Sequence, residues 1–183
     1  TTGSTRGYYQ WYGPDDLDGE TALCTRAADM AASRGVVVVQ AAGNFGSWGG
    51  LIAPADGDSV ITVGSVDRRG VIAWSSSRGP TADGRIKPDV VARGVEVFTV
   101  DGKTAFGYNR PGGTSFATPL VAGICVLMLE ESPERGPIDI RDRLRASGDR
   151  AASPDTVYGW GIPDAVRAVG AGLQGTPAET IIA

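Results

Sequence analysis

One serine of this chain lies in a context that suits nucleophilic chemistry. Ser115 belongs to the segment Gly112–Pro119 and opens an apolar pattern that predicts a helix, largely buried, from about Ser115 to Glu131. Unpaired backbone amides and the positive end of the helix dipole would then surround its hydroxyl. This environment favours a nucleophile whose attack generates an oxyanion. For Gly-Thr-Ser taken alone, the plainer interpretation is that Thr114 or Ser115 only caps the helix.

Asn44 is the second candidate, because of the segment that precedes it. The run Ala41-Ala42-Gly43-Asn44 follows Val36–Val39, whose four β-branched residues predict a strand buried on both faces, as in a parallel sheet. Sites in open α/β sheets form beyond the carboxyl ends of such strands. Small residues leave room for a ligand there, and Asn44 offers an amide donor. Taken alone, an asparagine at this place is better explained as a turn former.

The hydrophobic pattern predicts the elements that would position these residues. Residues 20–34 fit an amphipathic helix that ends at Gly35, and residues 60–63 fit a second buried strand. A helix followed by buried strands indicates a layered α/β domain. Shorter strands are expected at 71–74, 90–92, 95–100 and 104–108, and further helices at 138–147 and from Pro163 to about residue 170. Residues 1–19 are expected to form a loop and residues 172–183 a flexible tail.

Composition narrows the class of protein. The 183 residues suffice for one domain with a core, and 42% hydrophobic with 21% charged residues is an ordinary globular balance. No uninterrupted apolar run approaches the ~20 residues of a membrane span, so no membrane is expected as a partner. The 17 basic and 21 acidic residues leave a net charge of −4, which argues against nucleic acid as a partner.

Two scarce residue types limit the chemistry further. The chain has no histidine, so it cannot by itself supply an imidazole base. It has two cysteines, Cys24 and Cys125, too few for a disulfide scaffold. Both lie in alanine-rich, helix-like segments and are expected to be buried free thiols.

Six segments, in order along the chain, resemble the subtilisin-like serine proteases, the subtilase family (peptidase family S8). The most specific is Gly113–Gly123, which resembles the nucleophile signature of that family. The others are Val36–Asn44, Ser59–Val66, Trp74–Pro80, Lys87–Val95 and Tyr158–Ala165. The resemblance implies a three-layer α/β/α fold with a mostly parallel sheet, present as a partial domain. Residues 1–183 would be the C-terminal half of a catalytic domain.

The resemblance also implies roles for individual residues. Ser115 would attack a peptide carbonyl, and its backbone N–H and the Asn44 amide would form the oxyanion hole. The remaining substrate-binding positions are Ala41, Ala42, Gly43, Gly113 and Thr114, with Phe45 near the pocket mouth and a cis peptide bond expected at Pro54. The substrate would be a polypeptide, and the family resemblance places the protein outside the cell or in the cell envelope.

The chain departs from the family pattern in an important way. No Asp-Thr-Gly or His-Gly-Thr motif precedes Val36, and Arg93 and Leu120 replace a usual proline and a frequent, non-catalytic histidine. Without a base the Ser115 hydroxyl stays protonated and weakly nucleophilic. The expected partner is therefore the N-terminal half of the same domain, which would supply the aspartate and the histidine. Alone, the chain is expected to be inactive and to expose strand edges.

Three other interpretations were weighed. A non-catalytic subtilase-like module that binds peptide is the main alternative. A serine-carboxyl protease would need a Glu-Asp pair, but Glu20 and Asp29 have the wrong spacing, and Asn44 stands where an aspartate is expected. A phosphate-binding loop ending at Gly102-Lys103-Thr104 would need glycine where Val97 stands. No cofactor is required, although loop carbonyls near residues 55 and 57 could form a weak calcium site.

Overall fold

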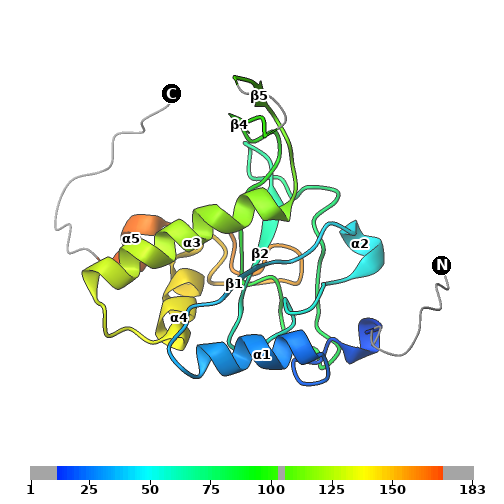
Figure 1. Ribbon diagram of the computed structural model, residues 1–183, viewed down its shortest axis with the longest axis vertical. Helices are drawn as coiled ribbons and strands as arrows, with labels where there is room; N and C mark the ends of the chain where they lie inside the picture. Colours follow the sequence, from blue (N-terminus) through cyan, green and yellow to red (C-terminus); the bar gives the residue numbers. More distant parts are fainter. Residues whose placement is uncertain (1–11, 103–105, 171–183) are drawn as a thin grey trace.

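A three-stranded parallel sheet forms the centre of the computed structural model, which describes residues 12–102 and 106–170 (Figure 1). The strands are β1 (Val39–Ala41), β2 (Ile61–Val66) and β3 (Val90–Arg93), in the order β1-β2-β3. Val39 lies opposite Ile61, and Val63 lies opposite Val90. The α/β class with a parallel sheet is therefore as predicted.

The other elements surround this sheet or extend from it. They are the 3-10 turn Pro14–Asp16, the helices α1 (Leu23–Ala32), α2 (Gly46–Gly49), α3 (Thr114–Glu131), α4 (Pro137–Ser147) and α5 (Ala165–Val169), and the strands β4 (Thr99–Val100) and β5 (Tyr108–Asn109). Helix α3 packs against all three central strands, and α4 and α5 pack behind it (Figure 1). The antiparallel β4–β5 hairpin projects away from this body (Figure 1).

The main core lies between the sheet and helix α3. All six residues of β2 are buried, because this central strand has a neighbour on each side. From α3, Ala117, Val121, Cys125 and Met128 recur at the spacing of one helical face and pack on the sheet. This packing fixes the first turn of α3 relative to the carboxyl ends of the strands.

The first strand differs from the prediction. Instead of a strand at 36–39 buried on both faces, β1 runs from Val39 to Ala41 and is only half-buried, and Val36 is 53% exposed. The reason is its place in the sheet, since β1 has a hydrogen-bonded neighbour on one side only. Apolar sequence predicted burial on both faces, but within the described residues no strand pairs with the outer edge of β1.

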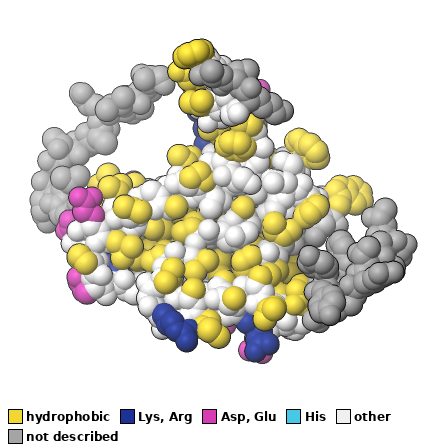
Figure 2. Space-filling model, viewed as in Figure 1, with side chains coloured by type: hydrophobic (Ala, Val, Ile, Leu, Met, Phe, Trp, Pro, Cys, Tyr) yellow, Lys and Arg dark blue, Asp and Glu magenta, His cyan; other side chains and the backbone are white. Residues whose placement is uncertain are grey.

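Helix α3 was expected to be largely buried, and this prediction is wrong for half of its surface. Leu120, Val126 and Leu127 are 51%, 63% and 49% exposed and do not belong to the core that α3 forms with the sheet. Hydrophobic side chains are spread over the face of the molecule that Figure 2 shows. The 18 residues of α3 are also long and apolar enough to cross a membrane by length and composition, which the search for uninterrupted apolar runs had not indicated. The buried face packs on the sheet, as the core helices of globular proteins do.

Smaller elements were predicted unevenly. Residues 71–74 contain one isolated bridge, between Val66 and Ile72, and the strand expected at 95–100 is limited to β4, while β5 begins at Tyr108 and residues 103–105 lie outside the described residues. Short segments bounded by glycine and proline make their backbone hydrogen bonds in turns. The pattern of apolar residues does not distinguish such turns from short strands. The helices expected at 20–34, at 138–147 and from Pro163 to about residue 170 are confirmed, the last as the shorter Ala165–Val169. The tail predicted at 172–183 and most of the N-terminal loop lie outside the described residues.

Both cysteines are free, as predicted, but only Cys125 is buried. Its thiol packs in the core beneath α3, where burial raises its pKa to about 12. Cys24 is exposed on α1, because only Thr25 and Ala32 of that helix are buried. The alanine-rich context correctly predicted the helix and wrongly predicted the direction of this side chain.

Candidate active site

Ser115 lies in the first turn of helix α3. The helix begins at Thr114, directly after Gly113, whose φ of 141° is one that residues with a side chain rarely adopt. Ser115 is exposed, and its hydroxyl has no hydrogen-bond partner among residues 12–102 and 106–170. The amides of this first turn have no partner within the helix, so the positive end of the α3 dipole surrounds this serine.

Asn44 is held beside this turn by a hydrogen bond from the backbone. The Thr114 N–H donates to Asn44 Oδ1 at 2.9 Å, across 70 residues of sequence. Because a backbone N–H can only donate, the facing atom must be the amide oxygen. The Asn44 NH2 group, with its two donors, is therefore left for another acceptor. Asn44 is exposed, so that acceptor can come from a bound molecule.

The segment before Asn44 is fastened to the same turn. The Gly43 N–H donates to Thr114 Oγ1 at 3.4 Å, and that hydroxyl lies 3.2 Å from both the Gly43 carbonyl and Asn44 Oδ1. The Thr114 hydroxyl therefore joins the carboxyl end of β1 to the start of α3. The two candidate segments of the sequence, residues 41–44 and 113–115, form one site.

Two glycines permit this close approach. A Cβ on Gly113 would lie 3.2 Å from Asn44 Oδ1, and a Cβ on Gly43, whose φ is 116°, would lie 2.7 Å from Ser77 Oγ. The Gly113 N–H donates to the Gly94 carbonyl at 2.7 Å, and this hydrogen bond helps to fix the turn before α3. A side chain at Gly113 would crowd Asn44, and one at Gly43 would crowd Ser77.

Ser77 is a positioning residue that the sequence analysis did not single out. Its N–H donates to the Gly43 carbonyl at 2.9 Å, and its hydroxyl accepts from the Phe45 N–H at 3.2 Å. It therefore holds the backbone on both sides of Asn44. The signal was present, because Ser77 lies within the Trp74–Pro80 motif, but the motif alone did not reveal what the serine contacts.

The remaining predicted residues lie close to this pair. Ala42, Gly43, Gly113 and Thr114 are buried, and Ala41 is half-buried at the end of β1. Phe45 is 59% exposed beside Asn44. Pro54 is cis, as predicted, and so are Pro80 and Pro88, which were not predicted.

No general base accompanies Ser115. The chain contains no histidine, and in the described part of the chain no carboxylate or amine hydrogen-bonds to this serine. The same part holds no group of three or more metal-ligating side chains. Near the loop suggested for calcium, the Ala55 carbonyl accepts a hydrogen bond from Thr62 Oγ1 at 2.6 Å. The arrangement can stabilise an oxyanion, but it cannot deprotonate the serine.

Comparisons of sequence point to known proteases. The family model described as the subtilase family matches residues 9–161. The serine protease AprX of Bacillus subtilis (strain 168) is 34% identical over 165 residues, which cover 79% of this chain and 37% of AprX. A subtilisin of Bacillus pumilus is 40% identical over 148 residues, which cover 79% of this chain and 50% of that protein. The chain thus spans half or less of the length of these curated relatives.

Solved structures agree with the sequence comparisons. The patellamide maturation protease PatA matches with a TM-score of 0.67 and 28% identity, covering 83% of this chain and 57% of PatA. The prenylagaramide maturation protease PagA matches with a TM-score of 0.65 and 25% identity, covering 79% of this chain and 54% of PagA. The predicted α/β fold class is confirmed. With a family match over most of its length and the Ser115–Asn44 geometry described above, this chain belongs to the subtilase family of serine proteases.

Proposed function

We propose that this chain provides the nucleophile and the oxyanion hole of a serine endopeptidase. Ser115 Oγ attacks the carbonyl carbon of a peptide bond, and the Ser115 N–H and the Asn44 NH2 group receive the oxyanion. The observation that carries the proposal is the Thr114 N–H bond to Asn44 Oδ1, 2.9 Å long, which leaves the amide donors of Asn44 free beside Ser115. A turn-forming asparagine would not need to be held across 70 residues of sequence.

The substrate is a polypeptide bound along the small residues around this pair. Ala41, Ala42 and Gly43 form one wall of the pocket for the residue that precedes the cut, and Phe45 lies at its mouth. Gly113 and Thr114 line the pocket next to the nucleophile. The burial of Ala42, Gly43, Gly113 and Thr114 supports this assignment, because it fixes the backbone against which an extended peptide would bind.

The base comes from a segment outside this chain. The N-terminal half of the same catalytic domain supplies a histidine, which takes the Ser115 proton, and an aspartate, which orients the histidine. The absence of histidine, the half-buried edge strand β1 and the exposed apolar side of α3 support this division. Alone, the chain binds peptide but does not cut it, and the complete enzyme acts outside the cell or in the cell envelope.

The test is complementation. The chain is produced alone and together with the N-terminal half of its catalytic domain, and cleavage of unfolded casein is followed. We expect cleavage only with both parts, and its loss on Ser115→Ala. Cleavage by the chain alone would contradict the division of labour. Peptide binding without cleavage in the combined enzyme would instead establish the non-catalytic alternative.

A further inference from the structure

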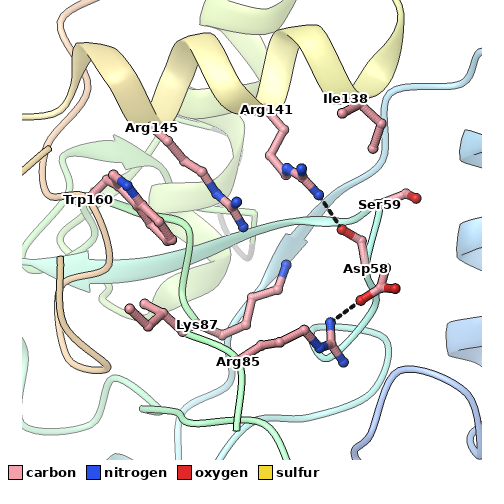
Figure 3. A pocket seen from close by; sticks show the side chains of 9 residues that line it. Asp58, Ser59, Arg85, Lys87, Ile138, Arg141, Arg145 and Trp160 are labelled. Atoms are coloured by element: carbon pink, nitrogen blue, oxygen red, sulfur yellow. Dashed lines mark hydrogen bonds and ion pairs between the residues drawn. The ribbon is translucent and has the colours of Figure 1, made fainter. Parts of the chain in front are cut away.

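A hollow of about 550 Å³ lies at the amino end of the central sheet, where β2 begins. Four cationic side chains line it: Arg85, Lys87, Arg141 and Arg145. Arg141 and Arg145 reach in from α4, while Arg85 and Lys87 come from the segment before β3 (Figure 3). Ser115 lies at the other, carboxyl end of the strands, so the proposed peptidase chemistry does not use this hollow.

The charged side chains around the hollow differ in how deeply they are buried. The side chains of Lys87, Arg141, Arg145 and Arg85 are 2%, 16%, 20% and 29% exposed. Only one carboxylate paired with them, Asp89, is buried. The other acidic partners, Asp58, Asp83 and Asp142, are 73%, 41% and 55% exposed, and Asp58, which pairs with Arg85, also lines the hollow. On the α4 side of the hollow, the three cations Lys87, Arg141 and Arg145 pair with two carboxylates, Asp89 and Asp142, which leaves one positive charge in excess there.

Lys87 and Arg145 share Asp89 between them. Lys87 Nζ donates to Asp89 Oδ2 at 2.8 Å and to the Val60 carbonyl at 2.6 Å, and Arg145 Nε donates to Asp89 Oδ1 at 2.8 Å. One negative charge thus faces two positive ones. Burial lowers the pKa of Lys87, Asp89 opposes that effect, and repulsion from Arg145 and Arg141 lowers the pKa further. An anion in the hollow would relieve this repulsion.

Arg141 and Lys87 do not use all of their N–H groups in hydrogen bonds with the described residues. Arg141 donates through Nε and Nη2 to Asp142 Oδ1 and through Nη1 to the Asp58 carbonyl. A guanidinium has five N–H bonds, so two remain. Lys87 uses two of its three. Figure 3 shows the Arg141, Arg145 and Lys87 side chains around the hollow that they line.

We propose that this hollow binds a small organic molecule that carries a phosphate or sulfate group. The phosphate or sulfate group lies between Arg141, Arg145 and Lys87. A guanidinium can donate two parallel hydrogen bonds to two oxygen atoms of that group, and the lysine ammonium can donate to a third. The rest of the molecule lies against Ile86, Ile138 and Trp160, which line the same space. The proposal does not depend on the proposed peptidase function.

Direct titration of the full chain tests the site. Inorganic phosphate and phenyl phosphate are titrated by calorimetry at constant ionic strength in chloride. We expect both to bind, and phenyl phosphate to bind several-fold more tightly because its ring covers the apolar wall. If neither binds, the proposal is overturned. Equal affinity of the two would overturn the organic part of the assignment and identify a site for the free ion.

A matched pair of variants locates the binding. Arg141→Gln removes a cation that lines the hollow, whereas Arg143→Gln removes one from the same helix that instead pairs with Asp139 at 2.9 Å. We expect Arg141→Gln to weaken phenyl phosphate binding about tenfold, from the loss of charge-assisted hydrogen bonds. Arg143→Gln should leave it unchanged. Equal effects of the two variants would overturn the site, and Arg141→Lys checks that charge, rather than misfolding, explains a loss.

Discussion

At the scale of single residues, the candidate site depends on how Asn44 is turned. Its Oδ1 accepts a hydrogen bond from the Thr114 N–H, so its NH2 group is not used in that contact. The sequence placed Asn44 and Ser115 as candidates from their neighbours alone. It could not show that Asn44 contacts the turn that carries Ser115, because the hydrogen bond from Thr114 to Asn44 joins positions 70 residues apart. Nor could it show that Ser77 and the Thr114 hydroxyl hold the turn in place.

Removal of the Asn44 amide tests its proposed role. In the complemented enzyme, Asn44→Ala should lower kcat by about 10²–10³-fold, a magnitude known from the oxyanion asparagine of subtilisin itself and not obtained from this geometry. The KM should change little, since the donor acts mainly on the transition state. Steady-state kinetics on a peptide substrate measure both. Thr114→Ser, which keeps the hydroxyl, serves as the control, and a large rise in KM with unchanged kcat would contradict the role.

The buried carboxylate Asp89 is the second residue whose loss has a defined consequence. Asp89→Asn would leave Lys87 buried without its counter-charge, which costs about 3–5 kcal/mol of unfolding free energy. Asp139, 47% exposed and paired with Arg143, is the control, and Asp139→Asn should cost about 0.5 kcal/mol or less. Urea unfolding measures both changes. Similar values for the two variants would show that the buried network contributes no more than a surface pair.

Asp89 also predicts a dependence of stability on pH. Burial alone would raise its pKa, but Lys87 and Arg145 hold it below the usual value for an aspartate. This contribution to stability is therefore complete above the unfolded-state pKa of about 4 and is lost as the pH falls through the lower folded-state pKa. The unfolding free energy should decline below about pH 4, and more steeply than in Asp89→Asn. Equal slopes would contradict the assigned pKa direction.

At the scale of elements, helix α3 combines a buried face with an exposed apolar one. The sequence predicted the helix well because its apolar pattern is long. It did not predict which side would be covered, because every side of α3 is apolar and burial depends on what packs against it. The same reason explains β1, since four valines indicate a buried strand but do not show that the described sheet ends there.

Two substitutions on α3 separate its faces. Met128 is fully buried, so Met128→Ala should lower the unfolding free energy by about 2–5 kcal/mol. Val126 is 63% exposed, so Val126→Ser should change the unfolding free energy by no more than about 0.5 kcal/mol.

The exposed side of α3 also gives a prediction about association. If the N-terminal half covers this face, Val126→Ser should weaken the association of that half with the chain several-fold. Denaturant unfolding and a binding titration measure the two effects, and unchanged association would contradict the proposed contact.

At the scale of the whole molecule, the residues proposed as nucleophile, oxyanion donor and substrate wall lie together at the carboxyl end of the sheet, and among the described residues no base lies with them. The zero histidine count first excluded any imidazole chemistry by this chain. Its membership of the subtilase family changes the meaning of that count, because the function proposed above assigns the base to the N-terminal half of the same domain. The chain spans half or less of the length of AprX and of the Bacillus pumilus subtilisin, and this is consistent with the account.

Labelling with a fluorophosphonate probe tests this account most directly, because the probe reacts only with an activated serine. The chain is treated alone and together with the N-terminal half of its domain, and mass spectrometry locates the label. We predict no label on the chain alone and stoichiometric label on Ser115 in the combined enzyme. Strong labelling of Ser115 in the isolated chain, or none in the combined enzyme, would contradict the account.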